Sequence, residues 1–174
     1  MERGRTQPMT APLGDIGPPS APLPQDPDWL GEVHADVQAV YHYWRTKCAG
    51  RPMPSRADID PAELIAYLPS VMLVDVRPSP PTYVYRLVGT REVSMRGVDP
   101  TGQPVATHSF GLAAAEALNN YNQVVARRAP WIDRAEMLSA DGRMLDRDKL
   151  FLPLSANGHD VDMILVYSVQ EQLP

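Results

Sequence analysis

The chain has 174 residues, of which 44% are hydrophobic and 21% charged, and its formal net charge is −5. This length predicts one domain with an extension, and the acidic balance argues against nucleic acid as a partner, because no lysine- or arginine-rich face is available to replace phosphate counterions. The only cysteine, Cys48, cannot form an internal disulfide and favours a cytoplasmic location, and no apolar run approaches the ~20 residues of a membrane span.

Residues 1–27 are rich in proline and contain few large apolar side chains. Burial therefore cannot offset the entropy that ordering this segment would cost. We expect a disordered tail. The alternative is that another protein recognises the proline-rich stretch.

A helical pattern follows within residues 28–50, from Trp29 to Cys48. Asp28 is suited to cap its start, and Gly50 with Pro52 ends it. Apolar side chains recur along one seam at spacings of three and four, namely Leu30, Val33, Val37, Val40 and Trp44. Full burial of such side chains contributes ~1.5–3 kcal/mol each. We therefore predict that the seam is an interface, either with the chain's own domain or with a second copy.

The next segment predicts a short helix and a β-hairpin. Asp60 is a good N-cap for a helix that ends at Leu68-Pro69. Residues 71–76 and 82–88 are β-rich and flank a proline-stiffened loop. Nearly every residue of both strands is apolar, so we expect both faces of the sheet to be covered.

After residue 88 the pattern changes to short, irregular helical turns, interrupted at Gly89, Gly97 and Gly102. Such turns are typical of a pocket wall rather than of a regular layer. A second long helix is predicted from Gly111 to Arg128. Its expected buried face consists of Leu112, Ala115, Leu118, Tyr121 and Val125.

The last third of the chain predicts three antiparallel strands. They cover Trp131–Leu138, residues 143–154 and Val161–Val169, with turn signals at Asp141-Gly142 and Asn157-Gly158. The order is then helix, short helix, two strands, helical turns, long helix and three strands. This order predicts an α+β fold.

Spaced motifs accompany this order of elements. They are Asp58-Ile59-Asp60-Pro61, Leu68-Pro69, Tyr85-Arg86-Leu87-Val88-Gly89-Thr90, Gly97-Val98-Asp99-Pro100-Thr101-Gly102, and Pro153-Leu154-Ser155 with Gly158 and Val161-Asp162. Over about residues 30–170 the chain resembles a family of short, stand-alone bacterial PAS proteins with a helical N-terminal extension. The resemblance implies a PAS-like domain over residues 51–172, with a five-stranded antiparallel sheet, a long helix and short helical turns on one face, and an additional N-terminal helix.

The resemblance also implies a small pocket between the sheet and the long helix, and PAS domains as a class commonly dimerise. We expect the pocket to be apolar and lined by Tyr85, Leu87, Met95, Leu118, Tyr121, Leu152 and Leu165. Arg86 is a charged residue within an apolar strand, so it needs a partner. It either holds a carboxylate in the pocket or pairs with Asp75 or Asp162.

The sequence does not identify a cofactor. PAS domains bind haem, flavin, organic acids, fatty-acid-like ligands or nothing. Photoactive flavin binding needs a cysteine in the helical turns, whereas Cys48 lies in the N-terminal helix. Haem needs an axial ligand, usually a histidine, and the long helix contains no histidine, although His108 precedes it. We expect no metal site, because His34 and His42 are eight residues apart and His159-Asp160 follows a turn signal.

Three functions are consistent with these observations. The first is a cytoplasmic sensory adaptor that binds a small ligand and signals through the seam by changed docking or dimerisation. The second is a ligand-free module that binds another signalling protein. The third is a small hydrolase that uses Ser155, His159 and Asp162. We expect no enzyme activity, because the chain has no nucleophile motif.

Overall fold

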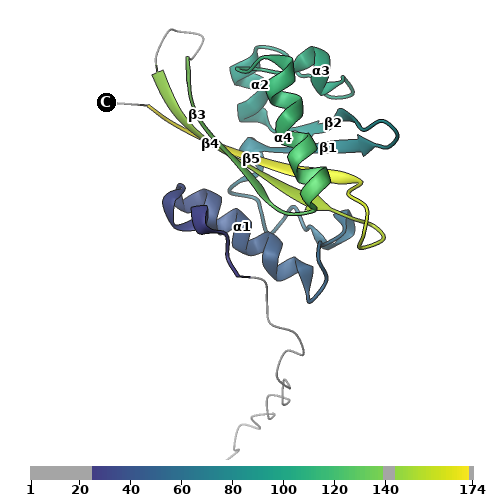
Figure 1. The fold of residues 1–174 in the computed structure, drawn as a ribbon. Coiled ribbons are helices and arrows are strands. Elements are labelled where there is room, and N and C mark those ends of the chain that lie inside the picture. Colours follow the sequence, from purple (N-terminus) through teal and green to yellow (C-terminus); the bar gives the residue numbers. More distant parts are fainter. Residues whose placement is uncertain (1–24, 139–143, 173–174) are drawn as a thin grey trace, which may run out of the picture.

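The computed structural model describes residues 25–138 and 144–172 (Figure 1). Most of the predicted tail and the Asp141-Gly142 turn lie outside these residues. In chain order, the elements are a 3-10 turn at Asp28–Glu32, α1 (Ala35–Cys48), 3-10 turns at Arg56–Asp58 and Leu68–Ser70, β1 (Val71–Arg77), β2 (Thr82–Val88), α2 (Thr90–Arg96), α3 (Val105–His108), α4 (Ala114–Arg127), β3 (Trp131–Leu138), β4 (Met144–Leu154) and β5 (Met163–Gln172).

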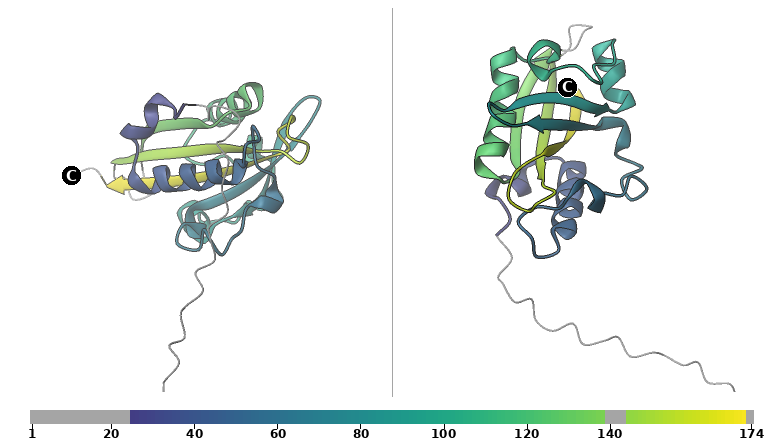
Figure 2. Two further views of the ribbon diagram at one scale, coloured as in Figure 1. Left: turned by 90° about the horizontal axis from the view of Figure 1, so that it is seen from below. Right: turned by 90° about the vertical axis from the view of Figure 1, so that its right-hand side faces the viewer.

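The five strands form one antiparallel sheet in the order β2-β1-β5-β4-β3. Helices α2, α3 and α4 lie on one face, here called the inner face, and α1 lies on the outer face (Figures 1 and 2). This arrangement confirms the predicted α+β fold. Because both faces are covered, the central strand β5 buries consecutive residues from Ile164 to Ser168.

Helix α1 packs against the outer face of the chain's own sheet. Val37, Val40 and Trp44 are buried there, as are Leu30 and Val33. The Trp44 indole Nε1 also donates a hydrogen bond of 2.9 Å to the carbonyl oxygen of Pro153 on β4. Of the two partners predicted for the seam, the structure therefore shows the chain's own domain.

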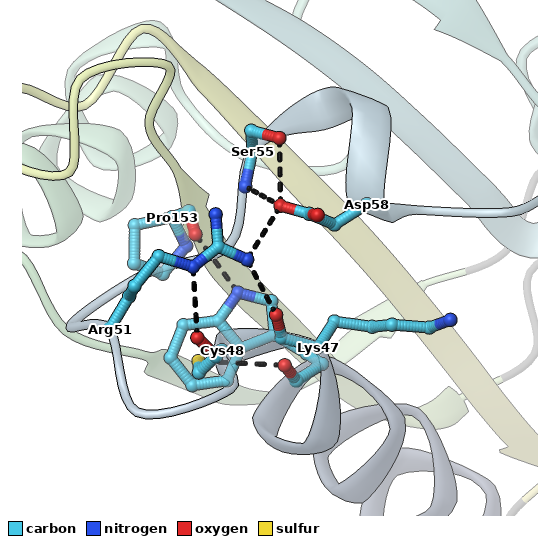
Figure 3. Close-up of polar contacts among 7 residues, drawn as sticks. Lys47, Cys48, Arg51, Ser55, Asp58 and Pro153 are labelled. Carbon is cyan, nitrogen blue, oxygen red and sulfur yellow. Dashed lines mark hydrogen bonds and ion pairs between the residues drawn. The ribbon is translucent and has the colours of Figure 1, made fainter.

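The end of α1 is fixed by Arg51 (Figure 3). Its guanidinium donates to the carbonyl oxygens of Lys47 and Cys48, each at 3.1 Å, and to Asp58 Oδ2 at 2.9 Å. Asp58 in turn accepts hydrogen bonds of 2.7 Å from the backbone N–H and the hydroxyl of Ser55. These contacts pull the connector after α1 back against the helix end.

The prediction of one continuous helix from Trp29 to Cys48 is wrong. Val33 is extended, with φ −97° and ψ 164°, and α1 starts only after His34. The imidazole Nδ1 of His34 accepts from the Asp36 N–H at 3.1 Å, while the His34 N–H donates to Asp148 Oδ2 at 2.9 Å. The periodicity of the seam indicates which residues are buried. It does not show the hydrogen bond from His34 to Asp148 on β4, which lies where the helical pattern is interrupted.

The predicted short helix after Asp60 is a series of turns. Asp60 Oδ1 does accept a hydrogen bond of 2.9 Å from the Ala62 N–H, as expected of a cap. The backbone N–H groups of Tyr67 and Leu68 then both bond to the carbonyl oxygen of Leu64. Pro69 follows directly, so a regular helix does not develop.

The buried face of α4 also differs from the prediction. Ala117, Asn120, Tyr121 and Val124 are buried, whereas Ala115 is exposed. The predicted face contains only apolar residues and Tyr121. The observed face includes Asn120 because its side-chain amide has polar partners on β3, which are described below.

Candidate functional site

A cluster of charged side chains lies on the inner face of the sheet. It is made of Glu92 and Arg96 from α2, Asp133 from β3, and Arg147 and Lys149 from β4. Glu92, Arg96, Arg147 and Lys149 are almost fully buried. Three cations thus accompany two carboxylates in the interior, so the cluster has an excess of positive charge.

Each carboxylate of the cluster is paired with one guanidinium. Glu92 Oε2 lies 3.6 Å from Arg96 Nη2, and Ser168 on β5 donates to Glu92 Oε1 at 3.0 Å. Asp133 Oδ2 accepts a hydrogen bond of 3.0 Å from Arg147 Nη2. These pairs offset part of the cost of burying charge.

Asn120 links the Asp133 side of the cluster to α4. Its Nδ2 donates to Asp133 Oδ2 at 2.9 Å, and its Oδ1 accepts from the Trp131 indole N–H at 3.0 Å. Both ends of the buried amide are therefore satisfied. This explains why a polar residue occupies the buried stripe of α4.

Arg96 connects the Glu92 side of the cluster to the residues before α4. Its guanidinium lies over the rings of Tyr85 and Phe110, 5.2 and 5.6 Å from their centroids, and donates to the His108 carbonyl oxygen at 3.2 Å. Such stacking favours a cation. Arg96 Nε is buried and has no hydrogen-bond partner among the described residues.

Lys149 is only 8% exposed. Among the described residues, its Nζ makes neither an ion pair nor a hydrogen bond. The ring of Phe151 lies 5.6 Å from Nζ. Burial, together with repulsion from Arg147 and Arg96, lowers the pKa of Lys149 to about 8, although Glu92 and Asp133 act in the opposite direction. A buried amine without a counter-ion is costly and marks a candidate site.

Lys149 borders a small cavity between the sheet and α4, here called the inner chamber. Its volume is about 10 Å³, and it is lined by Tyr85, Val105, Ser109, Phe110, Leu112, Ala117, Asn120, Tyr121, Lys149 and Phe151. That volume holds about one water molecule. Tyr121 is 1% exposed and its hydroxyl has no partner among the described residues. Two residues that carry buried polar groups, Tyr121 and Lys149, thus line a chamber that can take only a very small molecule.

The structure separates the residues predicted to line one pocket. Tyr85 and Tyr121 line the inner chamber. Leu87 and Leu165 line a groove on the opposite face of the sheet, and Leu152 is buried next to Leu165 in the sheet. Met95 and Leu118 are half-buried and border neither cavity.

A β-bulge explains why Leu87 does not share the face of Tyr85. The register between β1 and β2 shifts after Leu73, which leaves Arg86 without a direct partner in the pairing. Arg86 is 61% exposed on its side chain, and its Nε donates to Asp75 Oδ2 at 2.9 Å. Of the two alternatives for Arg86, the structure therefore shows the ion pair with Asp75.

The groove on the opposite face, here called the outer groove, has a volume of about 400 Å³. Its lining is mostly apolar and consists of Arg56, Ile59, Pro61, Leu64, Ile65, Leu68, Pro69, Val71, Leu73, Leu87, Val88, Gly89, Thr90 and Leu165. Ile65 is 73% exposed and Leu87 44% exposed. A Cβ atom at Gly89 would overlap the carbonyl oxygens of Leu68 and Pro69, so this wall of the groove requires glycine there.

The residues proposed for hydrolysis are used in the turn between β4 and β5. The Ser155 hydroxyl donates to Asn157 Oδ1 at 3.0 Å, and His159 Nδ1 lies 2.9 Å from Asp160 Oδ1. Asp162 Oδ2 accepts from the Ala156 N–H. Their contacts therefore stabilise the turn and do not join Ser155 to His159.

Residues 25–138 and 144–172 contain no group of three or more histidine, cysteine, aspartate or glutamate residues able to hold a metal ion. None of their helices is long and apolar enough to cross a membrane.

Solved structures with this fold are similar to the chain only at low sequence identity. The VqmA chain of a ligand–DNA complex from Vibrio cholerae is 14% identical with a TM-score of 0.50, over 63% of this chain and 49% of VqmA. The PAS domain of BvgS from Bordetella pertussis is 13% identical with a TM-score of 0.49, over 64% of this chain and 85% of that domain. The LOV protein of Rhodobacter sphaeroides is 16% identical with a TM-score of 0.44, over 57% of this chain and 58% of its own.

The sequence comparisons give the family. No protein in the curated set matches the chain. The family model for the PAS domain matches residues 33–167, a span that includes α1 and the whole sheet up to Tyr167. With this span and the five-stranded sheet, the chain belongs to the PAS domain family, whose members are sensory and signalling modules.

Proposed function

We propose that the chain is a cytoplasmic signalling adaptor that senses a small anion in the inner chamber. The observation that supports this most is the buried Lys149 amine, which borders the chamber without a counter-ion. An anion there would provide the missing partner. It would also balance the excess positive charge of the cluster.

The polarity and size of the chamber restrict the ligand. Asn120, Tyr121 and Lys149 are among the lining residues, so the lining is more polar than the predicted apolar pocket. The Tyr121 hydroxyl can donate a hydrogen bond to an anion. A volume of about 10 Å³ has room for about one water molecule, so even a small anion such as formate, acetate or bicarbonate must displace lining side chains such as Phe110 or Leu112 when it binds.

Strand β4 offers a path from the chamber to the outer face. Lys149 points inward, and its neighbour Asp148 accepts the His34 N–H at the start of α1. Asp148 Oδ1 also lies 3.4 Å from Arg134 Nε. We propose that the ligand changes how α1 docks, and hence dimerisation or contact with a signalling protein. Such a change requires the ligand to bind one arrangement of α1 more tightly than the other.

The test is a ligand-dependent shift in melting temperature. Formate, acetate and bicarbonate are each added to the wild type and to Lys149→Met. Binding to the folded state stabilises by RT ln(1 + [L]/Kd), so we expect at least one anion to raise the melting temperature of the wild type and not that of Lys149→Met.

Lys47→Met is the matched control, because Lys47 and Lys149 are the only two lysines of the chain. This variant should respond like the wild type, since Lys47 lies on the outer helix α1 and pairs with Glu63. The proposal fails if none of the three anions shifts the wild type, or if Lys149→Met responds equally.

The alternative function is a ligand-free module that binds another protein. The outer groove favours it, because exposed Leu87 and Ile65 border an open apolar surface. A purified partner whose binding is lost in Leu87→Ser but kept in Lys149→Met would support this alternative over anion sensing.

A further inference from the structure

The surroundings of the two lysines of the chain shift their pKa values in opposite directions. Lys47 Nζ lies 2.6 Å from Glu63 Oε2, and this hydrogen bond raises the pKa of Lys47. Lys149 has no such carboxylate, and burial lowers its pKa. Lys47 is therefore held as an ammonium, whereas Lys149 is the amine that reaches its neutral, nucleophilic form near physiological pH.

We propose that Lys149 is a reversible carbamylation site, at which carbon dioxide entering the inner chamber bonds to Nζ. This inference rests on the proposed function and names the chemical species that the chamber senses. It draws on three features: a buried amine without a partner among the described residues, an adjoining cavity with room for about one water molecule, and buried donors of Tyr121 and Arg96 that have no partner there.

The size and lining of the chamber favour carbon dioxide over larger ligands. Its side that faces α3 and α4 is formed by Val105, Phe110 and Leu112 among others. A neutral triatomic molecule can pass apolar side chains without the cost of desolvating a charge, which a carboxylate would incur. The charge then arises inside the chamber, when the bond forms.

The reaction needs no oxidant or reductant. The lone pair of neutral Nζ attacks the carbon atom of carbon dioxide and an N–C bond forms. One C–O π pair moves onto oxygen, and one N–H proton leaves to water. The product is a carbamate with one negative charge.

The surrounding donors suit this product. Tyr121 lines the chamber, and its buried hydroxyl has no partner among the described residues. Arg96 Nε is a second buried donor of the same cluster that has no partner there. A carbamate oxygen accepts hydrogen bonds, whereas an ammonium cannot, so carbamylation would use donors that the unmodified amine leaves idle.

The pH dependence of the site involves all elements packed against Lys149 on this face. The charged, titratable or polar groups that they contribute are Arg147 on β4, Asp133 on β3, Ser168 on β5, Tyr85 on β2, Glu92 and Arg96 on α2, and Asn120 and Tyr121 on α4. Both carboxylates are paired with guanidiniums. Between pH 7 and 8, the group whose titration changes most is therefore the Lys149 amine itself.

The direct test is to trap the carbamate on the full chain. The protein is equilibrated with ¹³C-labelled bicarbonate and carbon dioxide, alkylated with a trialkyloxonium reagent, digested, and mapped by mass spectrometry. We expect the labelled group on Lys149 and not on Lys47. Lys47→Arg should retain the label, and both Lys149→Arg and Lys149→Met should lose it. Because the mapping is done on the wild type, it does not depend on the folding of any variant.

The effect of pH separates this inference from the proposed function. At equal dissolved carbon dioxide, carbamate should increase at least about fivefold from pH 7 to pH 8, because the neutral fraction of an amine with a pKa of about 8 rises by that factor. Binding of formate to the Lys149 ammonium should instead weaken over the same range.

Three outcomes are distinct. A trapped carbamate on Lys149 that increases with pH supports the inference. A formate or bicarbonate shift that requires Lys149, without a trapped carbamate, overturns it and leaves the proposed function standing. The absence of both a shift and a carbamate overturns the two together.

Discussion

The two faces of the sheet hold the protein together in different ways. On the outer face, α1 buries apolar side chains and adds one indole hydrogen bond to β4. On the inner face, buried charges from three elements are paired with each other, and Lys149 is left over. Apolar burial stabilises folding directly, whereas buried ion pairs often contribute little net stability. We therefore expect the outer face to contribute more to stability, and the proposed ligand response belongs to the inner face.

The largest expected effect is on the outer face. Trp44→Ala removes a buried indole and its bond to Pro153, so we expect the free energy of unfolding to fall by about 3–5 kcal/mol in urea. His42→Ala is the control, because His42 is exposed on the same helix and should change stability by less than about 0.5 kcal/mol. If both variants lost equally little, α1 would not be docked as described.

The next effect breaks a pair on the inner face. Asp133→Ala removes the carboxylate that accepts from both Arg147 and Asn120, so the buried Arg147 guanidinium loses one counter-ion and the Asn120 amide loses an acceptor. We expect a loss of about 3 kcal/mol at neutral pH, measured by urea unfolding. Asp160→Ala, an exposed aspartate in a turn, should stay within about 0.5 kcal/mol. A loss below about 1 kcal/mol for Asp133→Ala would show that the cluster is solvated.

The unpaired lysine predicts a dependence of stability on pH. The folded-state pKa of Lys149, about 8, lies below that of an unfolded lysine. Between these two values the unfolded chain binds more protons, so stability should rise as the pH increases from about 8 towards 10. Lys149→Met should abolish this rise and should be more stable than the wild type at pH 7 by about 2 kcal/mol.

Lys47→Met is the control for this rise, since Glu63 raises the pKa of Lys47. The wild-type rise should persist in that variant. A wild type whose stability is flat from pH 8 to 10 would mean that Lys149 has an anionic partner in solution or is not buried.

The difference between the faces also explains what the sequence could predict. Strands β2 and β3 agree with the predicted residues 82–88 and Trp131–Leu138, because apolar alternation and turn signals are local. The same kind of local signal predicts the seam of α1. Burial of an apolar side chain needs no particular partner, so spacing alone indicates it.

The inner face could not be predicted in this way. Asn120 is buried because Trp131 and Asp133 satisfy its amide, and neither partner is visible in the periodicity of its helix. Lys149 precedes the apolar run Leu150–Leu152 and reads as a polar strand residue. Lys149 lacks a counter-ion because Glu92 and Asp133 are paired with the guanidiniums of Arg96 and Arg147. These pairs form only in the folded cluster, so the sequence does not show them.

The smallest expected effect on stability concerns the outer groove. Leu87→Ser changes a side chain that is 44% exposed, so the free energy of unfolding should change by no more than about 0.5 kcal/mol. Leu73→Ala, on the buried floor of the same groove, should cost about 2–4 kcal/mol. Fluorescence of an apolar dye should decrease in Leu87→Ser if the groove is an accessible apolar surface. If Leu87→Ser were as destabilising as Leu73→Ala, Leu87 would be part of the folding core rather than an accessible surface for a partner.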